Sequence, residues 1–87
     1  MFVVKGDKYK KLFQYLKGRN SGEVRLTFEQ IETLLGFKLP PSAYNHAEAW
    51  WSNNYDHSQA IAWMDAGYYT DYVTDTYLKK EIIFRRN

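Results

Sequence analysis

Residues 26–36 read LTFEQIETLLG, and this stretch predicts the end of a strand followed directly by a short amphipathic helix. Thr27 and Gln30 have the spacing of a capping box, in which the hydroxyl accepts the Gln30 amide and the Gln30 side chain returns to the cap. Leu26 and Ile31 stand where a hydrophobic staple would form. Gly36 ends the apolar periodicity, and the two prolines that follow prevent the helix from continuing.

The segments on either side of this helix predict a small α+β domain. Before it, residues 7–18 carry one apolar stripe and a lysine-rich opposite face, which favours a helix, and residues 23–26 alternate as a strand does. After it come helical patterns at residues 42–51 and 56–66, then β-rich runs at 68–74 and 81–86 that predict a hairpin. We therefore expect a winged-helix-like fold, with three to four helices on a three-stranded antiparallel sheet and one inserted helix.

Composition indicates a single domain over residues 1–87, held together by aromatic packing. The 87 residues include three Trp, eight Tyr and five Phe but no Cys, so neither a disulfide nor a thiolate metal site can form. No apolar run approaches the roughly 18 residues that span a bilayer, and Lys5 interrupts the start before a secretory segment could form. We expect a cytoplasmic protein without a membrane partner.

Several motifs resemble those of a family of small bacterial and phage domains of unknown function. They are LTFEQIE at residues 26–32, LGF at 35–37, LPPSA at 39–43, Trp50-Trp51, and HSQA at 57–60 with Trp63 and the later Ala66-Gly67. The resemblance covers most of the chain. It implies one shared domain type and brings no established activity.

The titratable residues do not form a pattern typical of an enzyme. His46 and His57 are the two histidines, and without cysteines their separation matches no metal-binding spacing. Asp56 and His57 are adjacent, but adjacent side chains seldom share a face, and no nucleophile accompanies them. We expect a non-enzymatic protein with no metal and no cofactor.

Charge segregation favours nucleic acid, and double-stranded DNA in particular, as the ligand. Residues 1–25 contain seven Lys or Arg against two acids, residues 79–87 contain four against one, and the middle is acidic. In a winged helix, the hairpin contacts phosphates and the helix before it reads bases. The predicted contacts are Lys79, Lys80, Arg85, Arg86, Ser58, Gln59, Lys10 and Lys11. Against this reading, residues 58–66 contain no Lys or Arg.

The alternative is a protein-interaction module, self-association included. Adjacent tryptophans on a helix point about 100° apart, so Trp50 and Trp51 cannot fill the same place in the core. We expect Trp50 to lie inside and Trp51 at an edge, where it would form a partner-binding patch with Asn53, Asn54 and Tyr55. The sequence leaves these two functions open.

Overall fold

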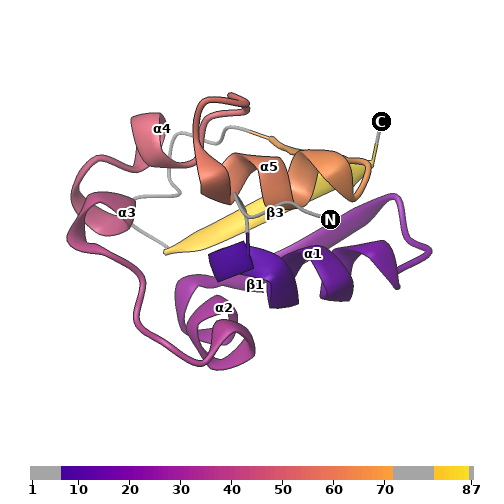
Figure 1. Cartoon of the computed structure of the whole chain (residues 1–87), viewed down its shortest axis with the longest axis horizontal. Coiled ribbons are helices and arrows are strands. Elements are labelled where there is room, and N and C mark those ends of the chain that lie inside the picture. Colours follow the sequence, from indigo (N-terminus) through magenta and orange to yellow (C-terminus); the bar gives the residue numbers. More distant parts are fainter. Residues whose placement is uncertain (1–6, 72–79, 87) are drawn as a thin grey trace.

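A computed structural model describes residues 7–71 and 80–86 and gives the chain an α+β fold. A 3-10 turn, η1, precedes the first of five α-helices in this part of the chain, and three strands complete the fold (Figure 1). The elements are η1 (Asp7–Tyr9), α1 (Lys10–Lys17), β1 (Glu23–Thr27), α2 (Phe28–Leu35), α3 (Pro41–Asn45), α4 (Ala47–Trp50), α5 (Ser58–Asp65), β2 (Tyr68–Thr70) and β3 (Glu81–Arg86). The predicted class, helices on a three-stranded antiparallel sheet, is confirmed.

The sheet has the order β1-β3-β2, and both neighbouring pairs are antiparallel. The last strand is therefore the central one, and Arg85 on it faces Glu23 of β1 and Tyr69 of β2 in the register. Because side chains alternate along a strand, each strand gives one set of residues to the helix-covered face. That set is buried and consists of Val24, Leu26, Tyr68, Thr70, Ile82 and Phe84. In Figure 1, α1 and α5 lie together over this face.

The start of α2 is built as its sequence predicts. The Thr27 hydroxyl accepts the Gln30 amide at 3.0 Å, and the Gln30 side-chain oxygen accepts the Thr27 amide at 2.8 Å, which completes the capping box. Phe28 donates its amide to the carbonyl oxygen of Lys80 at 2.8 Å, so the helix begins beside the residue that precedes β3. Gly36 ends the helix in the left-handed conformation, with φ of 88°.

The prediction of a single helix over residues 42–51 is wrong in one respect, because the segment forms two short helices that meet at His46. There the backbone leaves the helical region, with φ −132° and ψ 53°. A continuous helix would separate Ala43 and Trp51 by about 12 Å along its axis. In the fold, the Trp51 indole nitrogen donates to the Ala43 carbonyl oxygen at 3.1 Å, which the change of direction makes possible.

Two other local predictions need correction. The helix predicted over residues 7–18 begins only at Lys10, after a 3-10 turn, with Tyr9 at its N-cap. The strand expected over residues 68–74 is β2, which ends at Thr70, and residues 72–79 with the hairpin loop lie outside the described residues. In the described ranges, no helix has the length and apolar character needed to cross a membrane.

Candidate binding surfaces

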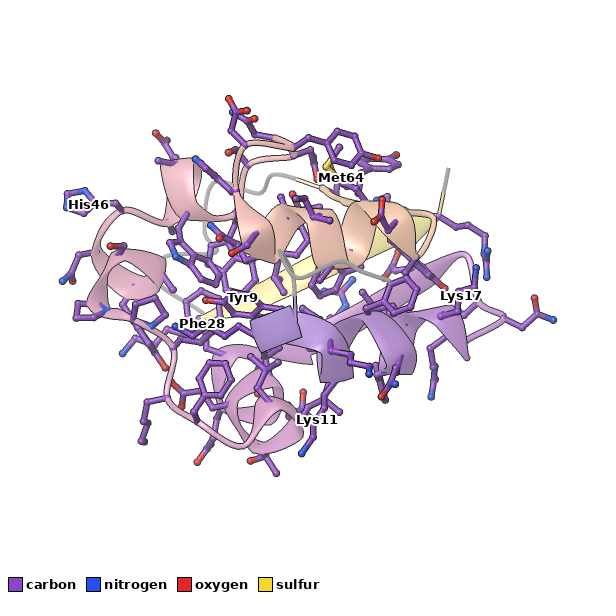
Figure 2. The ribbon with its side chains drawn as sticks, viewed as in Figure 1. Tyr9, Lys11, Lys17, Phe28, His46 and Met64 are labelled. Atoms are coloured by element: carbon purple, nitrogen blue, oxygen red, sulfur yellow. The ribbon has the colours of Figure 1, made fainter. Side chains whose placement is uncertain are left out.

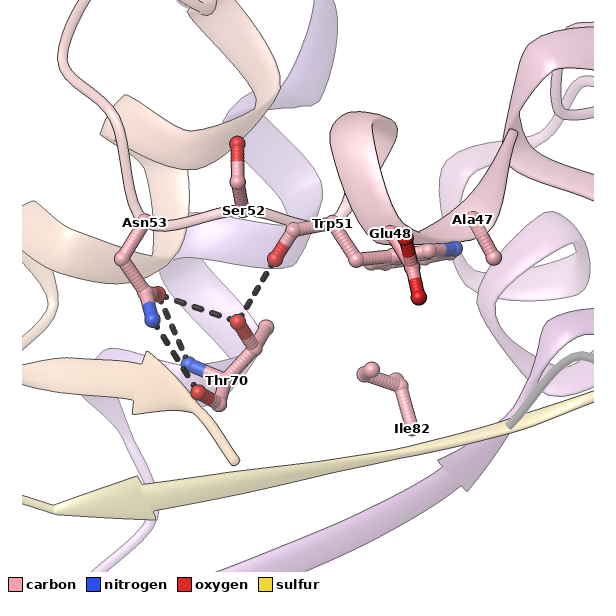
Figure 3. Close-up of a pocket in the computed structure, with 7 residues that line it drawn as sticks. All are labelled: Ala47, Glu48, Trp51, Ser52, Asn53, Thr70 and Ile82. Atoms are coloured by element: carbon pink, nitrogen blue, oxygen red, sulfur yellow. Dashed lines mark hydrogen bonds between the residues drawn. The ribbon is translucent and has the colours of Figure 1, made fainter. Parts of the chain in front are cut away.

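The side-chain amide of Asn53 completes the exposed edge of β2 in the way a neighbouring strand would. Its nitrogen donates to the Thr70 carbonyl oxygen at 3.0 Å, and its oxygen accepts the Thr70 amide at 2.8 Å (Figure 3). A strand at the edge of a sheet presents unpaired backbone groups to solvent and to other chains. Asn53 satisfies both backbone groups of Thr70 at this edge.

The same Asn53 oxygen also serves the core. It accepts the indole N–H of Trp63, which is fully buried, at 2.8 Å, and it lies 3.1 Å from the Thr70 hydroxyl oxygen. The Thr70 hydroxyl in turn donates to the Trp51 carbonyl oxygen at 2.6 Å. A side chain predicted to contact a partner therefore holds the 51–53 segment, α5 and β2 together.

The predicted placement of the adjacent tryptophans is wrong: Trp51 is buried and Trp50 is only partly so. Trp51 stacks on Phe28 at 5.1 Å and on Trp63 at 5.7 Å, measured between ring centroids. Trp50 meets Trp51 edge-on at 4.6 Å. The helix break at His46 turns Trp51 inward, so its indole cannot serve as an exposed partner contact.

Asn54 and Tyr55 are exposed, as a partner-binding role would require. Asn54 accepts the Asp56 amide at 2.8 Å, which forms a local turn, and Tyr55 is 58% exposed. The other large aromatic side chain with substantial exposure in the described ranges is Tyr69, at 37%, on the outer face of the sheet. The remaining described aromatic residues are buried or partly buried in the core, so few aromatic side chains are available on the surface to bind a partner.

A cavity of about 270 Å³ opens beside Trp51. Its lining combines an aromatic floor with residues of α4, β2 and β3: Ala47, Glu48, Trp51, Ser52, Asn53, Thr70 and Ile82 (Figure 3). The polar side chains of Asn53, Thr70 and Ser52 already bond to backbone or side-chain groups of the domain. The cavity therefore offers mainly an apolar surface.

A second cleft, of about 430 Å³, lies where α2 begins and contains Glu32, Lys38, Tyr44 and Lys80. One Glu32 oxygen accepts the Tyr44 hydroxyl at 2.7 Å and the Leu39 amide at 2.9 Å, which joins α2 to the start of α3. Burial, the hydrogen bond to Glu32 and nearby carboxylate charge raise the pKa of Tyr44 to about 12. Desolvation opposes ionisation of Glu32, but the bonds from Tyr44 and Leu39 and the charge of Lys38 lower its pKa overall. These contacts all join residues of the domain to one another.

The structure does not present α5 as a DNA-reading helix. Gln59 is buried and donates its side-chain amide to the Trp50 carbonyl oxygen at 3.0 Å, so the prediction of a surface contact there is wrong. Ala60, Ala62 and Trp63 are also buried, and Ser58 is partly buried. The helix packs against α1 and β2, which leaves it little free surface.

The predicted basic contacts do not gather in one patch. Lys80 directly precedes β3 and Arg86 ends it, so at about 3.3 Å per residue the two are separated by roughly 20 Å along the strand. Arg85 lies on the outer face and pairs with Asp71 and, at 2.8 Å, with Glu23, and the bond to Asp71 above all raises its pKa. Its charge is thus compensated within the sheet. Lys80 is exposed, with its ammonium group 5.8 Å from the centre of the Tyr44 ring, and Lys79 lies outside the described residues.

Of the seven cations without a carboxylate partner in the described ranges, three lie on α1, and the others are Lys8, Arg19, Lys80 and Arg86. Lys10, Lys11 and Lys17 are exposed, and α1 contains no acidic residue. Leu12 and Leu16 on the opposite side are buried, so the lysines project outward; Figure 2 shows Lys11 and Lys17 pointing away from the body of the domain. Arg19 follows directly, and Arg86 donates to its carbonyl oxygen at 2.8 Å. We call Lys10, Lys11, Lys17, Arg19 and Arg86 the basic α1 surface.

A family model described as "Domain of unknown function (DUF7662)" matches residues 9–87. The chain belongs to this family. Membership confirms the predicted resemblance to a family of unknown function, and the match covers every described α-helix and strand, from the N-cap residue of α1 to β3. No curated protein and no solved structure matches the chain.

The sequence predicted part of the basic α1 surface of this DUF7662 domain. Lys10, Lys11 and Arg86 were predicted contacts and Lys17 belongs to the predicted lysine-rich face, but Arg19, whose carbonyl oxygen accepts a hydrogen bond from Arg86, was not predicted. The helical spacing offered one usable indication. Lys10 and Lys17 are seven residues apart, so they lie on nearly the same line of a helix.

Proposed function

We propose that the domain is a non-enzymatic nucleic-acid-binding module that contacts the phosphate backbone of double-stranded DNA through the basic α1 surface. The observation that carries the proposal is the set of cations on and after α1 that have no carboxylate partner in the described ranges. Neutralising phosphates with such side chains releases condensed counterions, which gives affinity without regard to base sequence. The bacterial or phage origin and the cytoplasmic location predicted from the sequence remain part of this proposal.

The arrangement of elements supports a winged-helix-like domain that docks in an unusual way. The chain order and the β1-β3-β2 sheet agree with that fold, with α3 and α4 as the insertion. A winged helix places the helix before its hairpin in the major groove. Here α5 is too buried and has no basic residue, so backbone contact by α1 replaces base reading and the binding is sequence-tolerant.

Fluorescence anisotropy with a labelled duplex of mixed sequence, at 50 and 200 mM salt, tests the proposal. With about four phosphate contacts, affinity should fall roughly 100-fold between these salt concentrations. The double variant Lys10→Ala/Lys11→Ala should lower the slope of log affinity against log salt by about 1.8. Lys38→Ala is the control, because Lys38 is 90% exposed and its ammonium group pairs with Glu32 at 3.8 Å, so its charge is already compensated. Duplex binding that is absent at 50 mM salt, or that both variants weaken equally, contradicts the proposal.

A protein-interaction module remains the second candidate, supported by the exposure of Tyr55 and Tyr69. Exposed aromatic side chains are enriched at interfaces, and Tyr69 lies on the outer face of the sheet, opposite Arg85 of β3. Light scattering over a concentration series tests self-association. A dimer that Tyr69→Ser dissociates would support this candidate, whereas a strict monomer would remove its self-associating form.

A further inference from the structure

The four arginines of the chain fall into two chemically different pairs. Arg25 and Arg85 lie on the outer face of the sheet and bond to carboxylates: Arg25 to Glu23 at 3.0 Å, and Arg85 to Glu23 and Asp71. Arg19 and Arg86 have no carboxylate partner among the described residues. Each instead lies over a tyrosine ring, Arg19 over Tyr15 at 5.3 Å and Arg86 over Tyr68 at 5.1 Å.

The alternation of β3 explains why the two pairs differ. Arg85 points to the outer face, where Glu23 and Asp71 stand beside it, whereas Arg86 falls on the helix-covered side with Ile82 and Phe84. Arg86 therefore reaches the end of α1 and donates one N–H group to the Arg19 carbonyl oxygen at 2.8 Å. The strand places Arg86 beside Arg19 and Lys17, at the end of the row of lysines.

Each of these two guanidinium groups lies within cation–π distance of a tyrosine ring and keeps N–H donors that bond to no described residue. A guanidinium has five N–H donors in a planar fork, and one of those of Arg86 is used by the Arg19 carbonyl. Attraction to the ring holds each guanidinium near one position, so less side-chain entropy is lost when an anion binds. A planar fork held in this way suits the bidentate recognition of phosphate.

We propose that Arg19 and Arg86, oriented by Tyr15 and Tyr68, form a phosphate-binding site at the end of α1 that holds the DNA backbone. This inference rests on the proposed function and adds the residues that position the DNA strand on the protein. Lys10 and Lys17 are about 10 Å apart along the helix, far enough for them to contact separate phosphates of one DNA strand. The arginine pair extends that row, so a repeating phosphate chain fits the whole surface better than an isolated carboxylate does.

Charge-conserving variants separate geometry from charge. Arg19→Lys and Arg86→Lys keep the charge but lose the planar fork, and we expect each to weaken duplex binding 3- to 10-fold at 50 mM salt. Arg25→Lys is the matched control, since Arg25 is compensated on the outer face, and its affinity should stay within twofold of the wild type. Thermal melts show which variants are folded at the assay temperature. Arg19→Lys leaves the Arg19 carbonyl in place, so it tests the inference even where Arg86→Lys is unstable.

The results distinguish this inference from the proposal beneath it. Wild type that does not bind duplex at 50 mM salt overturns both. Binding that Lys10→Ala/Lys11→Ala weakens, but that Arg19→Lys and Arg86→Lys leave unchanged, overturns the phosphate site alone. A poly-glutamate peptide that displaces the duplex at equal charge concentration also overturns it, because the site is then selective for negative charge and not for phosphate.

Discussion

Replacing Asn53 with alanine removes the one side chain that serves both the edge of β2 and the buried indole of Trp63. Two N–H donors, the Thr70 amide and the Trp63 indole, lose their acceptor, and the Thr70 carbonyl loses its donor. Trp63 is fully buried and Thr70 is 5% exposed, so neither group reaches bulk water easily. The Thr70 hydroxyl keeps its bond to the Trp51 carbonyl.

Each buried group left unsatisfied costs about 1–3 kcal/mol. Two donors set a range of about 2–6 kcal/mol, and water entering the space left by the amide favours the lower half, about 2–4 kcal/mol. A domain of this size has a free energy of unfolding of roughly 4–13 kcal/mol, so the loss is a large fraction of the total. It corresponds to a fall in Tm of roughly 10–25 °C.

Urea unfolding followed by tryptophan fluorescence measures the effect directly, because Trp51 and Trp63 adjoin the site. Asn54→Ala is the matched control: its side-chain oxygen accepts one exposed amide, that of Asp56, so its loss should be at most about 1 kcal/mol. The loss of unfolding free energy in Asn53→Asp should lie between those of Asn53→Ala and Asn54→Ala. It keeps the acceptor but sets a carboxylate against the Thr70 carbonyl, and its deficit should shrink as pH falls and the carboxyl gains a proton to donate. An Asn53→Ala variant no less stable than Asn54→Ala refutes the reasoning.

Two further predictions concern pH and backbone geometry. The pKa of Tyr44 is raised from the ordinary 10.0 to about 12, so its contribution to stability is present below pH 10 and is lost as pH rises from 10 towards 12. Stability should fall over that interval in the wild type and fall less in Tyr44→Phe; equal slopes in urea titrations at pH 9.5 and 11.5 would count against this. Gly36→Ala should cost about 1–2 kcal/mol, because Gly36 has φ of 88° and nothing lies within 4 Å of a new Cβ atom, so strain alone acts. Gly18→Ala is its control, with φ of −81° and ordinary contact to the new atom, and should be neutral or slightly stabilising in thermal melts.

Local sequence chemistry was enough to predict the elements whose boundaries it sets. Thr27 and Gln30 mark the start of α2 because a capping box needs only residues three apart, and Gly36 ends it for an equally local reason. The alternation of Val24 and Leu26 predicted the buried face of β1. The α+β class follows from these elements in order.

The predictions that were wrong or incomplete concern residues whose contacts are distant in the sequence. Asn53 is exposed, as predicted, but its bonds to β2 were not predicted, because Thr70 is 17 positions away and becomes its neighbour only once β2 is in place. Trp51 and Gln59 were assigned to the surface because the turn at His46 has no sequence marker that we recognised. Arg85 and Arg86 looked equivalent, and only the strand register shows that one is compensated by Glu23 while the other faces α1.

The proposed function requires duplex DNA to contact the basic α1 surface, and amide chemical shifts of ¹⁵N-labelled protein measure that contact residue by residue. On titration with duplex at 50 mM salt, we predict shifts at Lys10, Lys11 and Lys17 and at Arg19 and Arg86, all of which diminish at 200 mM. Residues of the outer face, including Tyr69, should not move. An unchanged spectrum, or shifts confined to Tyr69 and Tyr55, would contradict the account.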